Sequence, residues 1–116
     1  MTQDNGRNRS AGDALRALRR GFHGELYLPG DAGYDGERLG WNRSVDVRPA
    51  LVAVAAGPED VQAVIVAARE HGLPLAVQAT GHGTVVAADG ALLLKTSRMA
   101  TVAIDPERRT ARVGPG

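Results

Sequence analysis

The sequence contains no cysteine, and only one tryptophan, one phenylalanine and two tyrosines occur among its 116 residues. Without cysteine, this stretch holds neither a disulfide nor a thiolate metal site, and cysteine usage says nothing about its redox compartment. The scarcity of aromatic side chains favours alternating strands and small-residue helices over an aromatic-rich β-sandwich. The hydrophobic content of 43% is carried by alanine, valine and leucine, which is enough for the core of one globular α/β unit.

A strong charge of one sign and long apolar runs are also lacking. Fourteen Lys and Arg stand against thirteen Asp and Glu, a formal net charge of +1, which is too weak to indicate nucleic acid or an anionic membrane as a partner. Residues 1–10 are polar and no apolar region follows them, which argues against a secretory signal. No run is long enough to cross a bilayer. We therefore expect a cytoplasmic protein.

Residues 1–24 are expected to form a flexible lead-in followed by one short helix. Residues 1–9 are rich in Asn, Gln, Arg and Gly, a composition that buries too little apolar surface to offset the entropy of ordering. Ser10 with Asp13 resembles a capping box, and apolar residues at helical spacing follow it. An unstructured basic tail is the alternative for this region.

The clearest unit in the sequence is a strand, a helix and a second strand. Residues 51–55 and 73–77 are short apolar runs that indicate buried strands. Between them Pro58 suits the first helical position, apolar residues recur at helical spacing, and Gly72 suits a left-handed cap. The two strands of such a βαβ unit are normally parallel.

Shorter elements surround this unit. Strand candidates lie at residues 26–28, 91–94, 101–104 and 110–113, with a helical turn or two within 34–41. The five-residue connection from Asp105 to Arg109 indicates that the last two strands form an antiparallel hairpin. The fold class is therefore α+β, a βαβ unit followed by short strands. A domain that stops on a hairpin strand leaves a sheet edge uncovered, so we expect it to be incomplete at its C-terminus.

One loop has the composition of a ligand site. It follows a predicted buried strand directly, where open α/β structures place ligands, and it consists of Gln78, Ala79, Thr80, Gly81, His82 and Gly83. Gly81 and Gly83 permit positive φ and let backbone N–H groups approach an anion, so the loop can cradle a pyrophosphate without a basic side chain. On these residues alone, a simple turn with a surface His82 is the commoner case, and the Rossmann and P-loop motifs are absent.

A series of motifs adds a resemblance to this interpretation. In order, they are PGD at 29–31, RPALVAV at 48–54, GPEDV at 57–61, AREHGLPLAV at 68–77, TGH at 80–82, DGALLL at 89–94, SRM at 97–99, IDPE at 104–107 and ARVGPG at 111–116. Together they resemble the opening of the PCMH-type FAD-binding domain of the vanillyl-alcohol oxidase and berberine-bridge family. The resemblance covers about residues 25–116, and the ordered combination makes it specific.

The resemblance implies roles for the loop that composition alone does not. In this family the loop wraps the FAD pyrophosphate, which implies backbone contacts from Ala79, Thr80, Gly81 and Gly83, and its His often bonds covalently to the 8α-methyl group of the flavin, which implies attachment at His82. Many members have Arg where Gln78 stands and Ser or Asn where Gly83 stands. The loop of this chain therefore lacks the basic side chain that would neutralise the pyrophosphate there.

The resemblance further implies the FAD-binding portion of a flavin-dependent oxidoreductase that accepts hydride from a small organic substrate. It implies that the rest of the FAD domain and the substrate domain lie beyond Gly116, so we assign no catalytic residue and leave open whether this chain alone is an enzyme. No metal, nucleic acid or membrane is expected as a partner. Two alternatives remain: a non-catalytic truncated or split-gene fragment, and a small nucleotide-binding module without flavin.

Overall fold

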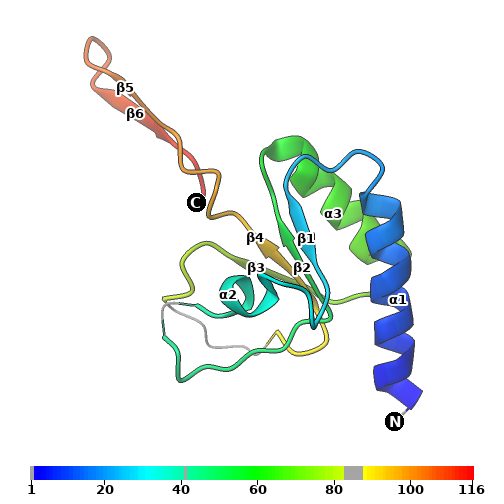
Figure 1. The fold of residues 1–116 in the computed structure, drawn as a ribbon. Coiled ribbons are helices and arrows are strands. Elements are labelled where there is room, and N and C mark those ends of the chain that lie inside the picture. The colour runs from blue at the N-terminus through cyan, green and yellow to red at the C-terminus, as the bar shows by residue number, and fades with distance from the viewer. Residues whose placement is uncertain (1, 41, 83–87) are drawn as a thin grey trace.

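The computed structural model describes residues 2–40, 42–82 and 88–116 of the chain. A four-stranded sheet with helices on both faces forms the body, and a two-stranded hairpin projects from it (Figure 1). In chain order the elements are α1 (Thr2–Leu18), β1 (Glu25–Tyr27), α2 (Tyr34–Arg38), β2 (Leu51–Val54), α3 (Pro58–Glu70), β3 (Leu75–Gln78), β4 (Leu92–Lys95), β5 (Val102–Asp105) and β6 (Thr110–Val113). This is the mixed α+β arrangement predicted from the sequence.

The sheet confirms the predicted strand–helix–strand unit, but the prediction that its second strand is buried is wrong, because β3 lies at the edge of the sheet with Leu75 and Val77 exposed. Strands β2 and β3 flank β4 and are both parallel to it, while β1 pairs with β2 in the antiparallel sense, so the order is β1-β2-β4-β3. All four residues of β4 are buried, whereas Val77 of β3 is 63% exposed. A strand that is apolar on both faces gains most from the central place, which explains why β4 enters between the two strands of the βαβ unit.

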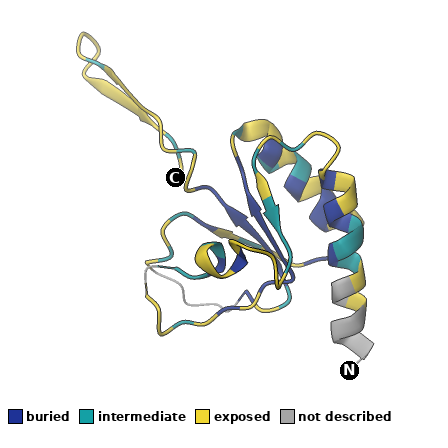
Figure 2. Ribbon diagram, viewed as in Figure 1, coloured by how far each residue is buried: buried dark blue, intermediate teal, exposed yellow. Residues whose placement is uncertain are grey.

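Two hydrophobic clusters lie on opposite faces of the sheet. One face packs against α1 and α3, and the other against α2 and the segment 42–50 (Figures 1 and 2). The first cluster contains Leu51, Leu92 and Leu94 with residues of the two long helices, and the second contains Val52 and Leu93 with Tyr34 and Val47. The alternation along β2 and β4 follows from the pleat, which points successive side chains to opposite faces.

Helix α1 begins at Thr2, so the flexible lead-in predicted over residues 1–9 is wrong for residues 2–9, and Ser10 lies inside the helix rather than capping it. The buried face near the C-terminal end of α1 packs in the same cluster as α3. Once that packed part is helical, each further residue adds a backbone hydrogen bond at little extra cost, so the helix extends through a polar segment. None of the described helices is long and apolar enough to cross a membrane.

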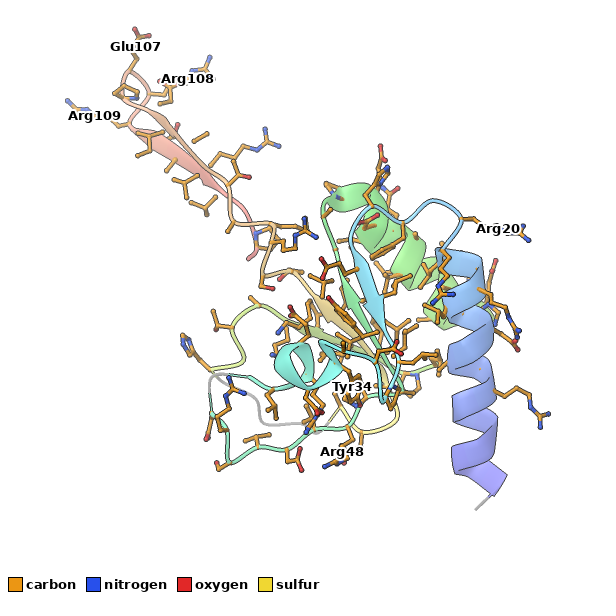
Figure 3. All side chains as sticks on the ribbon, in the orientation of Figure 1. Arg20, Tyr34, Arg48, Glu107, Arg108 and Arg109 are labelled. Atoms are coloured by element: carbon orange, nitrogen blue, oxygen red, sulfur yellow. The ribbon has the colours of Figure 1, made fainter. Side chains whose placement is uncertain are left out.

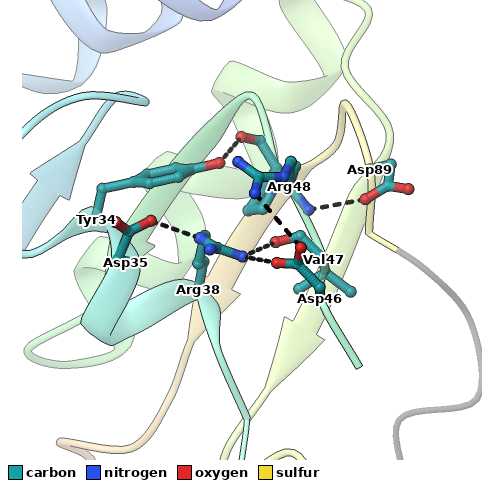
Figure 4. A network of polar contacts seen from close by, with 8 residues as sticks. Tyr34, Asp35, Arg38, Asp46, Val47, Arg48 and Asp89 are labelled. Carbon is teal, nitrogen blue, oxygen red and sulfur yellow. Dashed lines mark hydrogen bonds and ion pairs between the residues drawn. The ribbon is translucent and has the colours of Figure 1, made fainter. Parts of the chain in front are cut away.

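A polar network fixes the segment that follows α2 (Figure 4). The guanidinium of Arg38 donates to Asp35, to Asp46 and to the carbonyl of Val47. These hydrogen bonds raise the pKa of Arg38, and the bond from Arg38 lowers the pKa of Asp46. The Tyr34 hydroxyl donates to the carbonyl of Pro49 at 2.6 Å. The network therefore joins α2 to the chain that leads into β2.

Replacing Tyr34 with phenylalanine tests this connection. The change keeps the ring in its cluster but leaves the buried carbonyl of Pro49 without its partner, so we expect the free energy of unfolding to fall by about 1 kcal/mol. Tyr27→Phe is the matched control, because the Tyr27 hydroxyl bonds an exposed carboxylate of Glu25, and it should change stability by less than half as much. Urea unfolding measures both, and equal losses would contradict the assignment.

The hairpin predicted at the end of the chain is confirmed. Strands β5 and β6 pair with Val102 opposite Val113, and the charged turn residues Glu107, Arg108 and Arg109 lie at the far tip (Figure 3). The hairpin is tied to the body at its base, where the hydroxyl of Thr96, next to β4, donates to the carbonyl of Pro115 at 3.1 Å. Its apolar side chains are exposed, Ile104 by 74%.

Candidate functional site

Three strands end together at one edge of the sheet. Strands β2, β3 and β4 are parallel and in register, so their last residues, Val54, Gln78 and Lys95, lie side by side. In open α/β sheets ligands bind outside this carboxyl edge, because the loops that leave the strands converge there. The loop singled out from the sequence leaves β3 at this edge.

The last residues of β3 and β4 carry buried polar side chains. Gln78 and Lys95 are direct register partners on β3 and β4, so both side chains point to the face of the sheet that α2 covers. Gln78 is 9% exposed, and its side-chain Nε2 has no hydrogen-bond partner among the described residues. Lys95 is 6% exposed; its Nζ donates to the main-chain carbonyl of Glu37 at 2.9 Å and lies 3.7 Å from the Glu37 carboxylate.

The loop itself crosses the segment after α2 at very close range. Gly81 has φ of +80°, and a Cβ added to it would lie 2.8 Å from the Cα of Gly40 and 3.0 Å from Nε2 of Gln78. Only a glycine accommodates both the backbone conformation and the contact. The crossing therefore builds a cradle of bare backbone above the Gln78 amide.

The other predicted loop residues lie outside the packed interior where they are described. Thr80 and His82 are exposed and Ala79 is partly buried, so the imidazole is directed away from the core. Gly83, also predicted as a site residue, lies outside the described residues. The structure thus brings Gln78 and Gly81 together and leaves His82 accessible at the same edge.

Sequence reasoning missed Gly40 and Lys95. Gly40 belongs to a segment with weak periodicity, and its role follows only from the crossing with Gly81. Lys95 carried a signal, because it is the only lysine in the sequence and it closes an otherwise apolar strand. A lysine at the end of a buried strand is seldom left without a specific partner.

The donors at this edge suit an anionic dinucleotide. A buried amide N–H without a partner, a buried ammonium group and a glycine crossing without side chains offer hydrogen-bond donors and close backbone approach to phosphate oxygens. Within the described part of the chain, no group of three His, Asp or Glu residues is placed to hold a metal ion. The residues present therefore fit the diphosphate of FAD.

Comparison with known proteins decides the family. The family model described as FAD binding domain matches residues 49–116, more than half of the chain. The chain belongs to this FAD-binding domain family. The match runs from the segment before β2 through the loop and the hairpin, so it contains β2, β3, β4 and the loop, but neither α2 nor Gly40.

Relatives of this FAD-binding domain include oxidases. The curated (R)-6-hydroxynicotine oxidase of Paenarthrobacter nicotinovorans is 30% identical over 97 residues, which cover 82% of this chain and 21% of that protein. The crystal structure of 6-hydroxy-D-nicotine oxidase from Arthrobacter nicotinovorans matches with a TM-score of 0.76 and 30% identity, over 83% of this chain and 22% of that one. This chain therefore spans about a fifth of the length of the relatives it matches.

A more distant likeness concerns the fold alone. The wild-type berberine-bridge-enzyme-like protein 1 of Physcomitrella patens matches with a TM-score of 0.77 at 20% identity, over 89% of this chain and 23% of that one. The resemblance to a PCMH-type, berberine-bridge-like FAD-binding domain is thereby confirmed, as is the prediction that this chain holds only the N-terminal portion of that fold.

Proposed function

We propose that this chain supplies the diphosphate-binding part of the cofactor site in a flavin-dependent oxidase, with the FAD diphosphate held by the loop of residues 78–83. The observation that supports this most is the crossing of Gly81 over Gly40 above the unpartnered amide of Gln78. Bare backbone and an unused donor at the carboxyl edge of parallel strands suit a phosphate group. Ala79, Thr80 and Gly83 supply further backbone contacts in this proposal.

We also propose that His82 bonds covalently to the 8α-methyl group of the flavin. Its exposure leaves the imidazole accessible to a ligand on the loop. An N–C bond replaces the imidazole N–H hydrogen and one hydrogen of the methyl group. Those two hydrogens pass with their electrons to dioxygen, which becomes hydrogen peroxide. The bond would fix the ring system relative to the diphosphate site.

FAD and the protein have different roles in this proposal. Bound FAD supplies a hydride acceptor, which no amino-acid side chain provides. The residues of this chain bind and orient it: Gln78 and the loop backbone hold phosphate oxygens, and His82 anchors the ring. Substrate binding and any catalytic base belong, in this proposal, to other parts of the whole protein, and the substrate is a small organic molecule.

The covalent bond is tested by acid denaturation. The longest reading frame that contains these residues is expressed, precipitated with acid and examined for flavin fluorescence in the protein band. We expect flavin to remain with the parent protein and to separate completely from His82→Ala. His71→Ala is the matched control, because His71 caps the far end of α3, and it should retain the flavin.

The same measurement separates the alternatives. Flavin that dissociates from the parent on denaturation would contradict the bond at His82 but leave FAD binding in place. A parent protein that never acquires flavin would favour a non-catalytic fragment or a nucleotide-binding module without flavin. Retention of flavin by His82→Ala would place the attachment at another residue.

A further inference from the structure

We infer that Lys95 provides the positive charge of the diphosphate site, with Gln78 beside it as the neutral donor. The inference rests on the proposed function and deepens it, because it assigns the charge that the loop itself lacks. Residues 78–82 contain no lysine or arginine. A diphosphate group bound without any cation would depend on backbone dipoles and the neutral Gln78 amide, and a charge-assisted hydrogen bond is roughly twice as strong as a neutral one.

The contacts of Lys95 leave some of the N–H donors of its ammonium group free for a ligand. An ammonium group has three N–H donors. One is given to the carbonyl of Glu37 at 2.9 Å, and the carboxylate of the same residue lies at 3.7 Å, the long end of an ion pair. The Glu37 side chain is one-third exposed, so water competes for it. A buried ammonium with one partially solvated counter-ion is therefore open to a second anion.

The unpartnered amide of Gln78 is a second observation that indicates a ligand beside Lys95. A buried amide N–H without a partner is costly, because it loses its hydrogen bonds to water without replacement. Its register partner is Lys95, and the Gly81 crossing lies directly above its Nε2. A phosphate oxygen at this position would satisfy the amide and approach the ammonium on the neighbouring strand.

No other buried cation near this edge is available among the described residues. Arg38 is buried on the same face of the sheet, but its guanidinium already bonds Asp35, Asp46 and a carbonyl. Among the buried cations of the described residues, Lys95 is thus the one that has N–H donors left for a ligand. The preference should be for a phosphate-bearing ligand, since a single cation gains most from a full negative charge.

The test measures binding, in a His82→Ala background so that ligands remain exchangeable. Dissociation constants for FAD, ADP and riboflavin are determined by titration for that parent and for Lys95→Met. We expect Lys95→Met to weaken FAD and ADP by about 10- to 100-fold and riboflavin by less than about twofold, since riboflavin has no phosphate. Lys95→Arg should restore most of the affinity. Arg69→Met, in the last turn of α3, removes a charge at the opposite edge and should change little.

Glu37→Gln distinguishes a role of the Lys95 charge in binding phosphate from a role of Lys95 in holding Glu37 in place. If Lys95 acts only by holding Glu37 and the neighbouring Gly40, the loss of this ion pair weakens FAD binding as Lys95→Met does. If Lys95 offers its charge to phosphate, removal of the competing carboxylate strengthens binding of FAD and ADP. Equal losses for all three ligands in Lys95→Met, or weaker FAD binding in Glu37→Gln, would overturn the inference. A parent that binds neither FAD nor riboflavin would overturn the proposed function itself, and this inference with it.

Discussion

Replacing Asp60 with alanine is expected to lower the free energy of unfolding by about 3–5 kcal/mol. Asp60 is 2% exposed in the first turn of α3. Its carboxylate accepts hydrogen bonds from the N–H groups of His23 and Gly24 at 2.9 Å and from that of Ala56 at 2.8 Å. Alanine would leave these three donors unpaired and would free the start of β1 from the end of β2.

Glu59→Ala provides the matched control for Asp60. Both residues lie in the first turn of α3, but Glu59 is exposed, and a carboxylate at such a position gains about 0.3–1 kcal/mol from the helix dipole. Urea unfolding monitored by circular dichroism gives both values. A loss in Asp60→Ala no larger than that in Glu59→Ala would show that the three hydrogen bonds contribute nothing to stability.

The Asp60 carboxylate also makes the free energy of unfolding depend on pH. Burial raises the pKa of Asp60, but the hydrogen bonds from the N–H groups of His23, Ala56 and Gly24 outweigh it, so the pKa is lowered. A lowered folded-state pKa means that this stabilisation is present above the unfolded-state value of about 3.9 and is lost as pH falls through the folded-state value. The parent should therefore lose stability below about pH 4 more steeply than Asp60→Ala does.

Local patterns predicted much of this fold because they report local physics. The helix after Pro58 and the hairpin around Asp105 were predicted because capping, spacing and turn chemistry act within a few residues. The loop after β3 is a candidate site on local grounds too, because its glycines follow a strand directly. The place of β4 between β2 and β3 was not predicted, because strand order depends on which strand buries both faces.

Contacts between distant segments account for what the sequence analysis missed. No local pattern in the sequence links His23 to Asp60, yet the N–H of His23 donates to the Asp60 carboxylate on another element. In the same way, the pairing of Lys95 with Gln78 and Glu37 joins three elements, and no periodicity within one element reveals such a set.

Gly81→Ala should have the largest effect on the proposed site. A side chain at φ of +80° is strained by about 1–2 kcal/mol, and its Cβ would lie 2.8 Å from the Cα of Gly40, where two backbones meet. With overpacking of about 1–3 kcal/mol, we expect the variant to lose about 2–5 kcal/mol of stability if the crossing is kept. The alternative is that the crossing opens.

Opening of the crossing has its own readout, because the proposed diphosphate cradle would then be lost while the rest of the sheet stays folded. Flavin content should fall even at temperatures where Gly81→Ala remains folded. Gly40→Ala should have the same effect in weaker form, since its Cβ would lie 3.2 Å from Gly81 without a positive φ. Gly12→Ala, in the interior of α1 with open space around it, should instead stabilise the protein by about 0.5–1 kcal/mol. Normal flavin content in Gly81→Ala would mean that the crossing plays no part in holding the cofactor.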